Sequence, residues 1–250
     1  IGALLFTLIF FNRLKFTSPD IIKAGLLLGF FQYVGFCTQT IGMIYTTASN
    51  SALITGITIL IVPFAQYAVV KKKVHIENWI GVAVVLGGLY LLTQPDVKGL
   101  NIGDLITMFC AFAWAFYIIY VDVYTNKYDI ITLIFIQLWF VVIAAGGTGM
   151  IFEDFSAIAF TQNEILSLLY MGILATFVTT ILLNRFQKDT TPIRASIIYT
   201  WEQPAAVLLA VIFINEHFSP WQLLGGGIMV AGILFSETYE YLGNNTHRMT

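Results

Sequence analysis

The sequence consists of long apolar stretches joined by short polar loops, and this pattern limits the possible folds more than any other feature. A helix needs roughly 20 apolar residues to cross the hydrocarbon core of a membrane, which is about 30 Å thick. Most of the apolar stretches reach or approach that length. They cover residues 1–11, 21–44, 51–70, 79–92, 105–121, 130–152, 165–186, 195–214 and 221–239. We therefore predict an all-α polytopic membrane protein.

The composition excludes a soluble globular domain. Hydrophobic residues make up 58% of the chain and charged residues only 10%, whereas soluble domains are about 45–50% apolar and about 25% charged. No cluster of basic residues points to nucleic acid. The two cysteines, Cys37 and Cys110, lie in apolar stretches without a CxxC motif or a nearby histidine, so we interpret them as packing residues. We expect no metal, cofactor or disulfide.

The basic residues indicate which side of the membrane each loop occupies. When the loops are numbered in chain order, eleven of the twelve Lys and Arg residues fall on one side, and only Lys98 falls on the other. The eleven are Arg13, Lys15, Lys23, Lys71, Lys72, Lys73, Lys127, Arg185, Lys188, Arg194 and Arg248. Cytoplasmic loops carry such an excess of basic residues. This sorting predicts a protein of the cell (inner or plasma) membrane with a cytoplasmic C-terminus.

The first apolar stretch is too short to cross a bilayer. Residues 12–20 are cytoplasmic by their charges, so residues 1–11 should approach them from outside the membrane. We expect a further helix to precede Ile1 in the complete protein. That helix would bring the total to ten.

The two halves of the chain resemble each other. Residues 79–88 match residues 223–232 at a constant offset of 144, with Gly81 on Gly225 and Gly88 on Gly232. The alternative is chance likeness between two glycine-rich apolar helices. Five helices per half would make the repeats run in opposite directions, an arrangement common in secondary transporters, whose substrate sites lie between the repeats near the midplane. We predict repeats over residues 1–94 and 101–240 and a polar tail over 241–250.

Several segments resemble EamA-type permeases of the drug/metabolite transporter superfamily. They are residues 45–56, 61–63 and 79–92 in the first half, and residues 169–172, 175–176, 191–195, 202, 215–216 and 225–232 in the second. One departure is the segment Glu202-Gln203-Pro204, in which one residue separates a Glu-Pro pair that the family usually has adjacent. The resemblance implies a ten-helix bundle of two inverted five-helix repeats. It also implies export of an amino acid or a related small metabolite.

Glu202 is the candidate coupling residue. It lies eight residues past Arg194, which is roughly 12 Å along a helix, and no other acid lies at such depth in an apolar stretch. Polar groups at membrane depth are costly and commonly functional. The functional interpretation is a carboxylate that couples transport to protons or binds a cation. The alternative is a structural group, bonded to a neighbouring helix or to backbone freed by Pro204.

Other deep polar and aromatic residues are candidates to bind substrate. They are Gln32, Gln39, Thr55, Thr58, Trp114, Tyr117, Gln137, Tyr199 and Trp201. Amides, hydroxyls and aromatic faces together suit a small amphipathic metabolite, although each residue alone could instead make interhelical contacts. Pro63 and Pro204 are the predicted flexing points. Gly25 and Gly29 are expected to pack helices within one protomer, which leaves a monomer or a weak homodimer.

These observations favour a secondary transporter that works by alternating access. A channel or a non-transporting membrane assembly protein is the alternative. An enzyme is not expected, because His75, His217 and His247 lie at helix ends or in loops and Glu202 has no deep acidic partner. The sequence contains no P-loop, so this chain is not expected to drive transport with ATP by itself.

Overall fold

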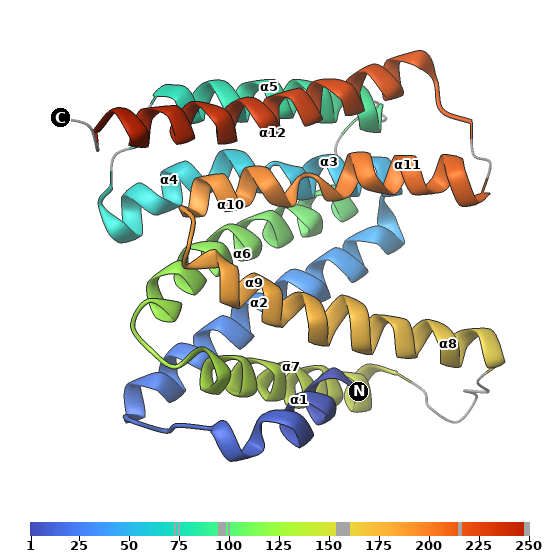
Figure 1. Cartoon of the computed structure of the whole chain (residues 1–250). Helices are drawn as coiled ribbons and strands as arrows, with labels where there is room; N and C mark the ends of the chain where they lie inside the picture. Colours follow the sequence, from blue (N-terminus) through green and yellow to red (C-terminus); the bar gives the residue numbers. More distant parts are fainter. Residues whose placement is uncertain are drawn as a thin grey trace. The chain divides into compact units, whose positions relative to one another are not determined.

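The computed structural model describes residues 1–72, 74, 76–94, 99, 101–153, 161–214 and 217–247, and the regular structure of these residues is entirely helical. The first half holds α1 (Gly2–Phe10), the short 3₁₀ turn η1 (Phe11–Arg13), α2 (Pro19–Tyr45), α3 (Ala48–Gly56), α4 (Thr58–Val70) and α5 (Ile76–Thr93) (Figure 1). The second half holds α6 (Ile102–Thr125), α7 (Ile130–Phe152), α8 (Gln162–Tyr170), the π-helix η3 (Met171–Val178), α9 (Thr179–Gln187), α10 (Pro192–Tyr199), α11 (Glu202–Ile214) and α12 (Pro220–His247).

Among the residues that the structure describes, six helical segments are long and apolar enough to cross a membrane. They are Pro19–Tyr45, Ala48–Val70, Ile102–Thr125, Ile130–Phe152, Gln162–Gln187 and Pro192–Phe213, and three shorter apolar helices cover Gly2–Arg13, Asn78–Thr93 and Pro220–Ser236. Each of the nine predicted stretches falls on one of these helices, which confirms the all-helical prediction. One difference is at the C-terminal end, where α12 continues to His247 and so enters the predicted polar tail.

Large apolar side chains cover the outside of the helices. Leu8, Met150 and Phe152 are each more than 80% exposed. A soluble monomer rarely exposes apolar surface on this scale. In a bilayer these side chains would contact lipid, while the helices satisfy their own backbone hydrogen bonds.

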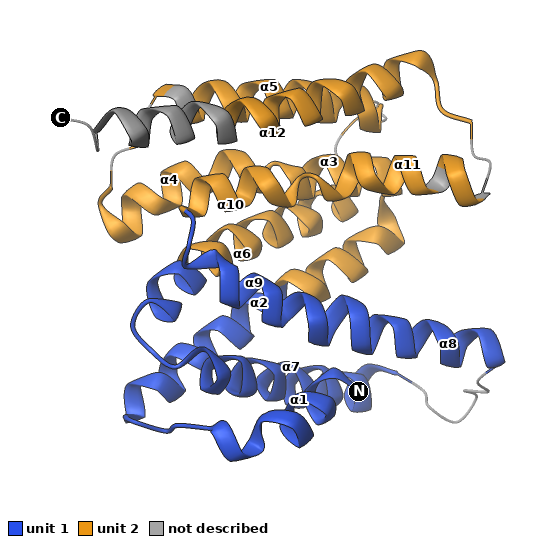
Figure 2. Cartoon of the chain, in the orientation of Figure 1, with its two compact units in different colours: residues 1–34, 120–190 blue, residues 35–119, 191–250 orange. Residues whose placement is uncertain are grey.

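The chain forms two compact units that do not coincide with the sequence repeats (Figure 2). Unit 1 combines Ile1–Val34 with Tyr120–Thr190, and unit 2 combines Gly35–Ile119 with Thr191–Thr250. Helices α2 and α6 each continue from one unit into the other. Each unit therefore contains segments of both sequence halves.

In unit 1, glycines on α2 allow close packing against α7. A Cβ atom on Gly25 would lie 2.6 Å from Ile136 Cβ, and one on Gly29 would lie 2.6 Å from Phe140 Cβ. The prediction that these glycines pack helices within one protomer is confirmed. On another side of α7, the Trp139 indole nitrogen donates a hydrogen bond of 2.9 Å to the Thr7 hydroxyl of α1.

The helix that begins at Gln162 contains an eight-residue π-helical segment, η3. Two threonine hydroxyls make hydrogen bonds with the spacing of a π-helix. Thr176 donates to the Met171 carbonyl and Thr179 donates to the Leu174 carbonyl, each five residues back and each at 2.8 Å. Helix α1 approaches η3 closely, and a Cβ on Gly2 would lie 2.8 Å from the Gly172 carbonyl oxygen. π-Helical segments often occur at functional sites, and nothing in the sequence marked this one.

In unit 2, α5 and α12 lie side by side (Figure 1). A Cβ on Gly88 would lie 2.7 Å from the Gly225 carbonyl oxygen, and a Cβ on Gly225 would lie 2.6 Å from the Gly88 carbonyl oxygen. Val84, which precedes Gly88 on α5, contacts Gly232, which follows Gly225 on α12. The two helices are therefore antiparallel, and their closest contact is made by residues that the sequence repeat had singled out.

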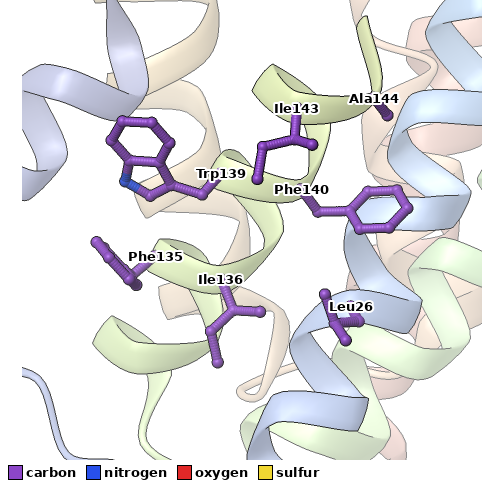
Figure 3. A pocket seen from close by; sticks show the side chains of 7 residues that line it. All are labelled: Leu26, Phe135, Ile136, Trp139, Phe140, Ile143 and Ala144. Carbon is purple, nitrogen blue, oxygen red and sulfur yellow. The ribbon is translucent and has the colours of Figure 1, made fainter. Parts of the chain in front are cut away.

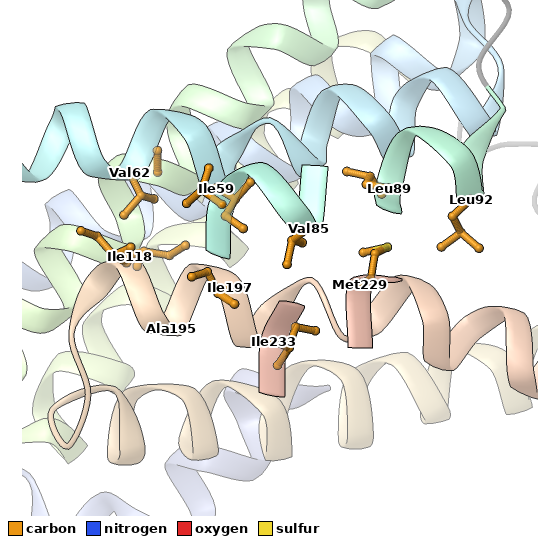
Figure 4. Packing of buried hydrophobic residues seen from close by; sticks show 13 residues of the cluster. Ile59, Val62, Val85, Leu89, Leu92, Ile118, Ala195, Ile197, Met229 and Ile233 are labelled. Atoms are coloured by element: carbon orange, nitrogen blue, oxygen red, sulfur yellow. The ribbon is translucent and has the colours of Figure 1, made fainter. Parts of the chain in front are cut away.

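The core of unit 2 includes residues of this helix pair (Figure 4). Its buried apolar residues are Ile59, Val62, Val82, Val85, Leu89, Leu92, Ala115, Ile118, Ile193, Ala195, Ile197, Met229 and Ile233. They come from α4, α5, α6, α10 and α12. Both sequence halves thus share one core within this unit.

The offset of 144 residues also relates the helix boundaries in unit 2. The Thr47 side chain caps α3 by accepting from Asn50 N, and the Thr191 side chain caps α10 by accepting from Arg194 N. The same offset relates α4 to α11 at both ends, and α5 to α12 at their first residues. The repeat is therefore expressed in local backbone structure as well as in glycine positions.

Candidate functional site

Two helices of unit 2 are interrupted partway along their length. Helix α3 ends at Gly56 and α4 begins at Thr58, while α10 ends at Tyr199 and α11 begins at Glu202. At the first break, the Ile57 amide donates to carbonyls three and four residues back. At the second break, the Trp201 amide donates to the Ile198 carbonyl, three residues back, at 2.9 Å. These tighter bonds interrupt the regular α-helix, and Ile57 and Trp201 are themselves 144 residues apart.

The predicted flexing points lie close to the breaks but not at them. Pro204 cannot donate to the Thr200 carbonyl, which instead accepts from Gln203 N at 3.3 Å, so this proline contributes directly to the second break. Pro63 lies inside the continuous helix α4, six residues after Ile57. At the first break the neighbouring residue is Gly56, whose missing side chain makes room for Leu89 of α5. Glycine also weakens a helix by about 1 kcal/mol relative to alanine.

Polar side chains from several helices meet at the first break. The Cys110 thiol of α6 is buried and lies 4.0 Å from the Thr55 hydroxyl of α3. It also hydrogen-bonds with Trp114 and with Thr38 of α2. The Thr58 hydroxyl, at the start of α4, donates to the Ala111 carbonyl at 3.2 Å. Helix α6 is thus tied to both halves of the broken helix.

Aromatic rings extend this group. Trp114 makes edge-to-face contacts with Tyr117, at 5.4 Å between ring centroids, and with Phe36, at 5.1 Å. Tyr199 packs against the core of unit 2, in the neighbourhood of Tyr117. Five of the predicted site residues therefore come together. We call the resulting group the break site, and it consists of Thr55, Thr58, Cys110, Trp114, Tyr117 and Tyr199.

The break site offers hydroxyls, a thiol, an indole and aromatic faces, and none of its side chains carries a charge at neutral pH. The Thr58 hydroxyl has its hydrogen on the Ala111 carbonyl, so its oxygen can still accept a bond. Such groups can orient a small amphipathic molecule by hydrogen bonds and aromatic contacts. Within the described residues, no three His, Cys, Asp or Glu side chains are grouped to hold a metal ion.

Two of the remaining candidates belong to unit 1. Gln32 and Gln137 are both buried there, on α2 and α7. The Gln32 Oε1 atom has no hydrogen-bond partner among the residues that the structure describes. In unit 2, Gln39 is half-buried on α2, one residue after Thr38.

Trp201 and Glu202 lie at the second break, and both side chains are exposed. The Glu202 carboxylate makes no hydrogen bond or ion pair within the described part of the chain. The alternative prediction was a structural bond from Glu202 to a neighbouring helix, and the described residues contain no such bond. The sequence repeat makes Glu202 the equivalent of Thr58, and Tyr199 the equivalent of Thr55, so the two breaks present candidate residues at matching positions.

Sequence reasoning missed two contributors to this group. Cys110 was interpreted as a packing residue, although it contacts Thr55, and Thr38 was not selected at all. A signal for Cys110 was present, because positions 110, 114 and 117 recur at helical spacing and place this thiol on the same face of α6 as Trp114 and Tyr117.

A hollow in unit 1 has a different character (Figure 3). Its volume is about 550 Å³, and its lining is Leu26, Phe135, Ile136, Trp139, Phe140, Ile143 and Ala144. The indole N–H of Trp139 is bonded to Thr7. This hollow therefore lacks the groups needed to orient a polar substrate, and its surface suits contact with lipid.

Comparison with known proteins identifies the class. The profile of the EamA-like transporter family matches residues 1–94 and 101–238. The chain therefore belongs to the EamA-like transporter family, as its resemblance to that family predicted. It is a multi-pass membrane transporter and not an enzyme.

Similar proteins share this general description. An uncharacterized transporter of Archaeoglobus fulgidus is 29% identical over 85% of this chain and 68% of its own length. The uncharacterized transporter YcxC of Bacillus subtilis is 22% identical over 90% of this chain and 76% of its own length. A protein of known crystal structure has the same fold, with a TM-score of 0.78 and 14% identity over 94% of this chain and 84% of that one.

Proposed function

We propose that this protein is a secondary transporter that exports a small organic metabolite, an amino acid or a related compound, by alternating access. The observation that carries the proposal is the pair of broken helices in unit 2, whose second halves begin at the equivalent positions Thr58 and Glu202. Secondary transporters commonly build substrate and ion sites from discontinuous helices in inverted repeats.

Two inverted repeats of five helices account for the helix boundaries. The antiparallel contact of α5 with α12 is the relation that inverted repeats require, and the offset of 144 residues supports the same pairing for α3–α4 with α10–α11. The distribution of Lys and Arg supports a cytoplasmic C-terminus in the cell membrane.

In this proposal the break site binds the substrate. Thr55, Thr58 and Tyr199 supply hydroxyls, while Trp114 and Tyr117 supply aromatic surface. The flexing segments are the two breaks together with the prolines that follow them, Pro63 and Pro204. Gln39 and Trp201 are proposed to contribute further polar and aromatic surface in unit 2. Gln32 and Gln137 stay proposed substrate-binding residues of unit 1.

Glu202 is the proposed coupling group, and we expect Glu202→Gln to abolish the dependence of transport on a pH gradient. The reason is that a carboxylate can take up and release a proton, whereas an amide cannot. The measurement is uptake by proteoliposomes of a mixed pool of labelled amino acids and small metabolites, with and without an imposed pH gradient.

Glu164→Gln provides the matched control for this substitution. Glu164 is exposed and accepts from the backbone and hydroxyl of Thr161 at the start of α8, a capping role that glutamine can also fill. The control should keep the gradient dependence of the wild type. If Glu202→Gln keeps it as well, Glu202 is not the coupling group and protons would have to be coupled elsewhere.

A further inference from the structure

A second groove in unit 1 lies at the end of the helices that carries basic residues. Its volume is about 510 Å³. The lining residues are Phe6, Phe10, Thr125, Tyr128, Asp129, Ile130, Ile131, Ile134, Ile181, Arg185 and Lys188. The end of α1, the start of α7 and the end of α9 all meet at this place. The groove is separate from the break site, which belongs to unit 2.

The groove has a polar rim and an apolar wall. Arg185 and Lys188 stand one turn apart near the end of α9, and the wall runs from Ile130 to Ile134 on α7 and back from Lys188 to Ile181 on α9. Four to seven helical residues correspond to a depth of about 6–10 Å. A ligand that fills the groove therefore needs an anionic part at the rim and an apolar part below it.

The two cations at the rim are available to such a ligand. Arg185 and Lys188 make no ion pair and no side-chain hydrogen bond within the described residues, where the one ion pair joins Lys23 to Asp20. The groove also contains Asp129, but that carboxylate caps α7 and accepts from both the backbone N and the hydroxyl of Thr132, at 2.9 and 2.8 Å. The backbone N of Lys15 donates to the Thr132 hydroxyl at 2.8 Å, and Lys127 and Asp189 directly precede and follow lining residues in the chain.

We propose that this groove binds an anionic phospholipid of the surrounding bilayer. The phosphate would lie against Arg185 and Lys188, and the first part of an acyl chain would lie against Phe6, Phe10 and Ile181. Basic pockets between membrane helices recognise anionic head groups in this way. A small soluble phosphate would leave the six apolar side chains of the groove uncovered. The proposal requires only that unit 1 lies in a membrane, so it does not depend on what the protein transports.

The test uses the purified full chain in detergent, with dioleoyl phosphatidylglycerol or dioleoyl phosphatidylcholine added at equal concentration. Native mass spectrometry measures the fraction of protein that retains each lipid. We expect the wild type to retain the anionic lipid at least fivefold more than the zwitterionic one. Arg185→Gln/Lys188→Gln should lose this preference, and Ile181→Trp, which fills the groove but keeps both charges, should reduce it.

Two further variants separate a specific site from general charge and from misfolding. Lys71→Gln/Lys72→Gln removes two exposed cations from unit 2 and should keep the preference for the anionic lipid. Arg185→Lys/Lys188→Arg exchanges the two cations at the rim and should also keep the preference that the glutamine pair loses. The proposal is overturned if Lys71→Gln/Lys72→Gln loses the preference equally, or if Ile181→Trp leaves it unchanged. Equal competition by soluble glycerol phosphate would also overturn it, because the site would then bind the phosphate alone.

Discussion

Gly225→Leu is expected to lower the melting temperature of the protein by about 10 °C. A Cβ at this position would lie 2.5 Å from Leu92 N and 2.6 Å from the Gly88 carbonyl oxygen, and both atoms belong to the backbone of α5. Backbone cannot swing aside as a flexible side chain can, so α5 and α12 must separate. Overpacking typically costs about 1–3 kcal/mol, and in a chain of this size about 3 kcal/mol corresponds to a shift of about 6–12 °C.

The measurement is the fraction of monodisperse protein left after heating in detergent, followed by size-exclusion chromatography. Gly227→Leu and Gly87→Leu are matched controls on the same two helices, because a Cβ at either glycine meets nothing within 4 Å. Both controls should melt within a few degrees of the wild type. If Gly225→Leu melts with them, the close α5–α12 contact is not part of the folded protein.

Trp114→Ala is expected to raise the substrate concentration needed for half-maximal transport at least tenfold, which is about 1.4 kcal/mol of binding free energy. The indole contacts Tyr117, Phe36 and the Cys110 thiol, so its loss removes the largest aromatic surface of the break site. Trp114→Phe keeps an aromatic ring and should show a smaller increase. The measurement is the concentration dependence of initial uptake in proteoliposomes.

Trp139→Ala separates loss of substrate contact from loss of packing. Trp139 is a second tryptophan within a membrane helix, but it belongs to unit 1, where its indole bonds to Thr7. Truncating either tryptophan leaves a cavity that destabilises the fold by about 3–5 kcal/mol. Only Trp114→Ala should change the half-maximal concentration among the molecules that remain folded. If both variants change the half-maximal concentration equally, Trp114 is not part of the substrate-binding surface.

The helical framework could be predicted from the sequence because a membrane imposes a strong physical requirement. Each apolar stretch must satisfy its own backbone hydrogen bonds and span a fixed thickness. Each predicted stretch therefore falls on an apolar helix in the described part of the chain. The match of Gly88 and Gly225 with their repeat partners likewise indicated positions where two helices now meet at backbone distance.

The breaks could not be predicted, because they depend on contacts between distant segments. Pro63 suggested a weak point in α4, yet the helix breaks at Ile57, beside a glycine that accommodates Leu89 of another helix. Counting residues placed Glu202 at depth, but it could not show that Glu202 begins a new helix with an exposed side chain. Nothing in the sequence marked the π-helix η3. Cys110 is a different case, because its helical spacing from Trp114 and Tyr117 places it on their face of α6.

Counterflow in proteoliposomes tests the central claim of alternating access most directly. Vesicles loaded with an unlabelled pool of amino acids and small metabolites are diluted into the same pool carrying label, with no pH gradient or membrane potential. An alternating-access transporter should accumulate label faster in loaded than in empty vesicles, and the effect should saturate with concentration. Uptake that rises linearly with concentration and ignores the internal pool would contradict alternating access and indicate a channel.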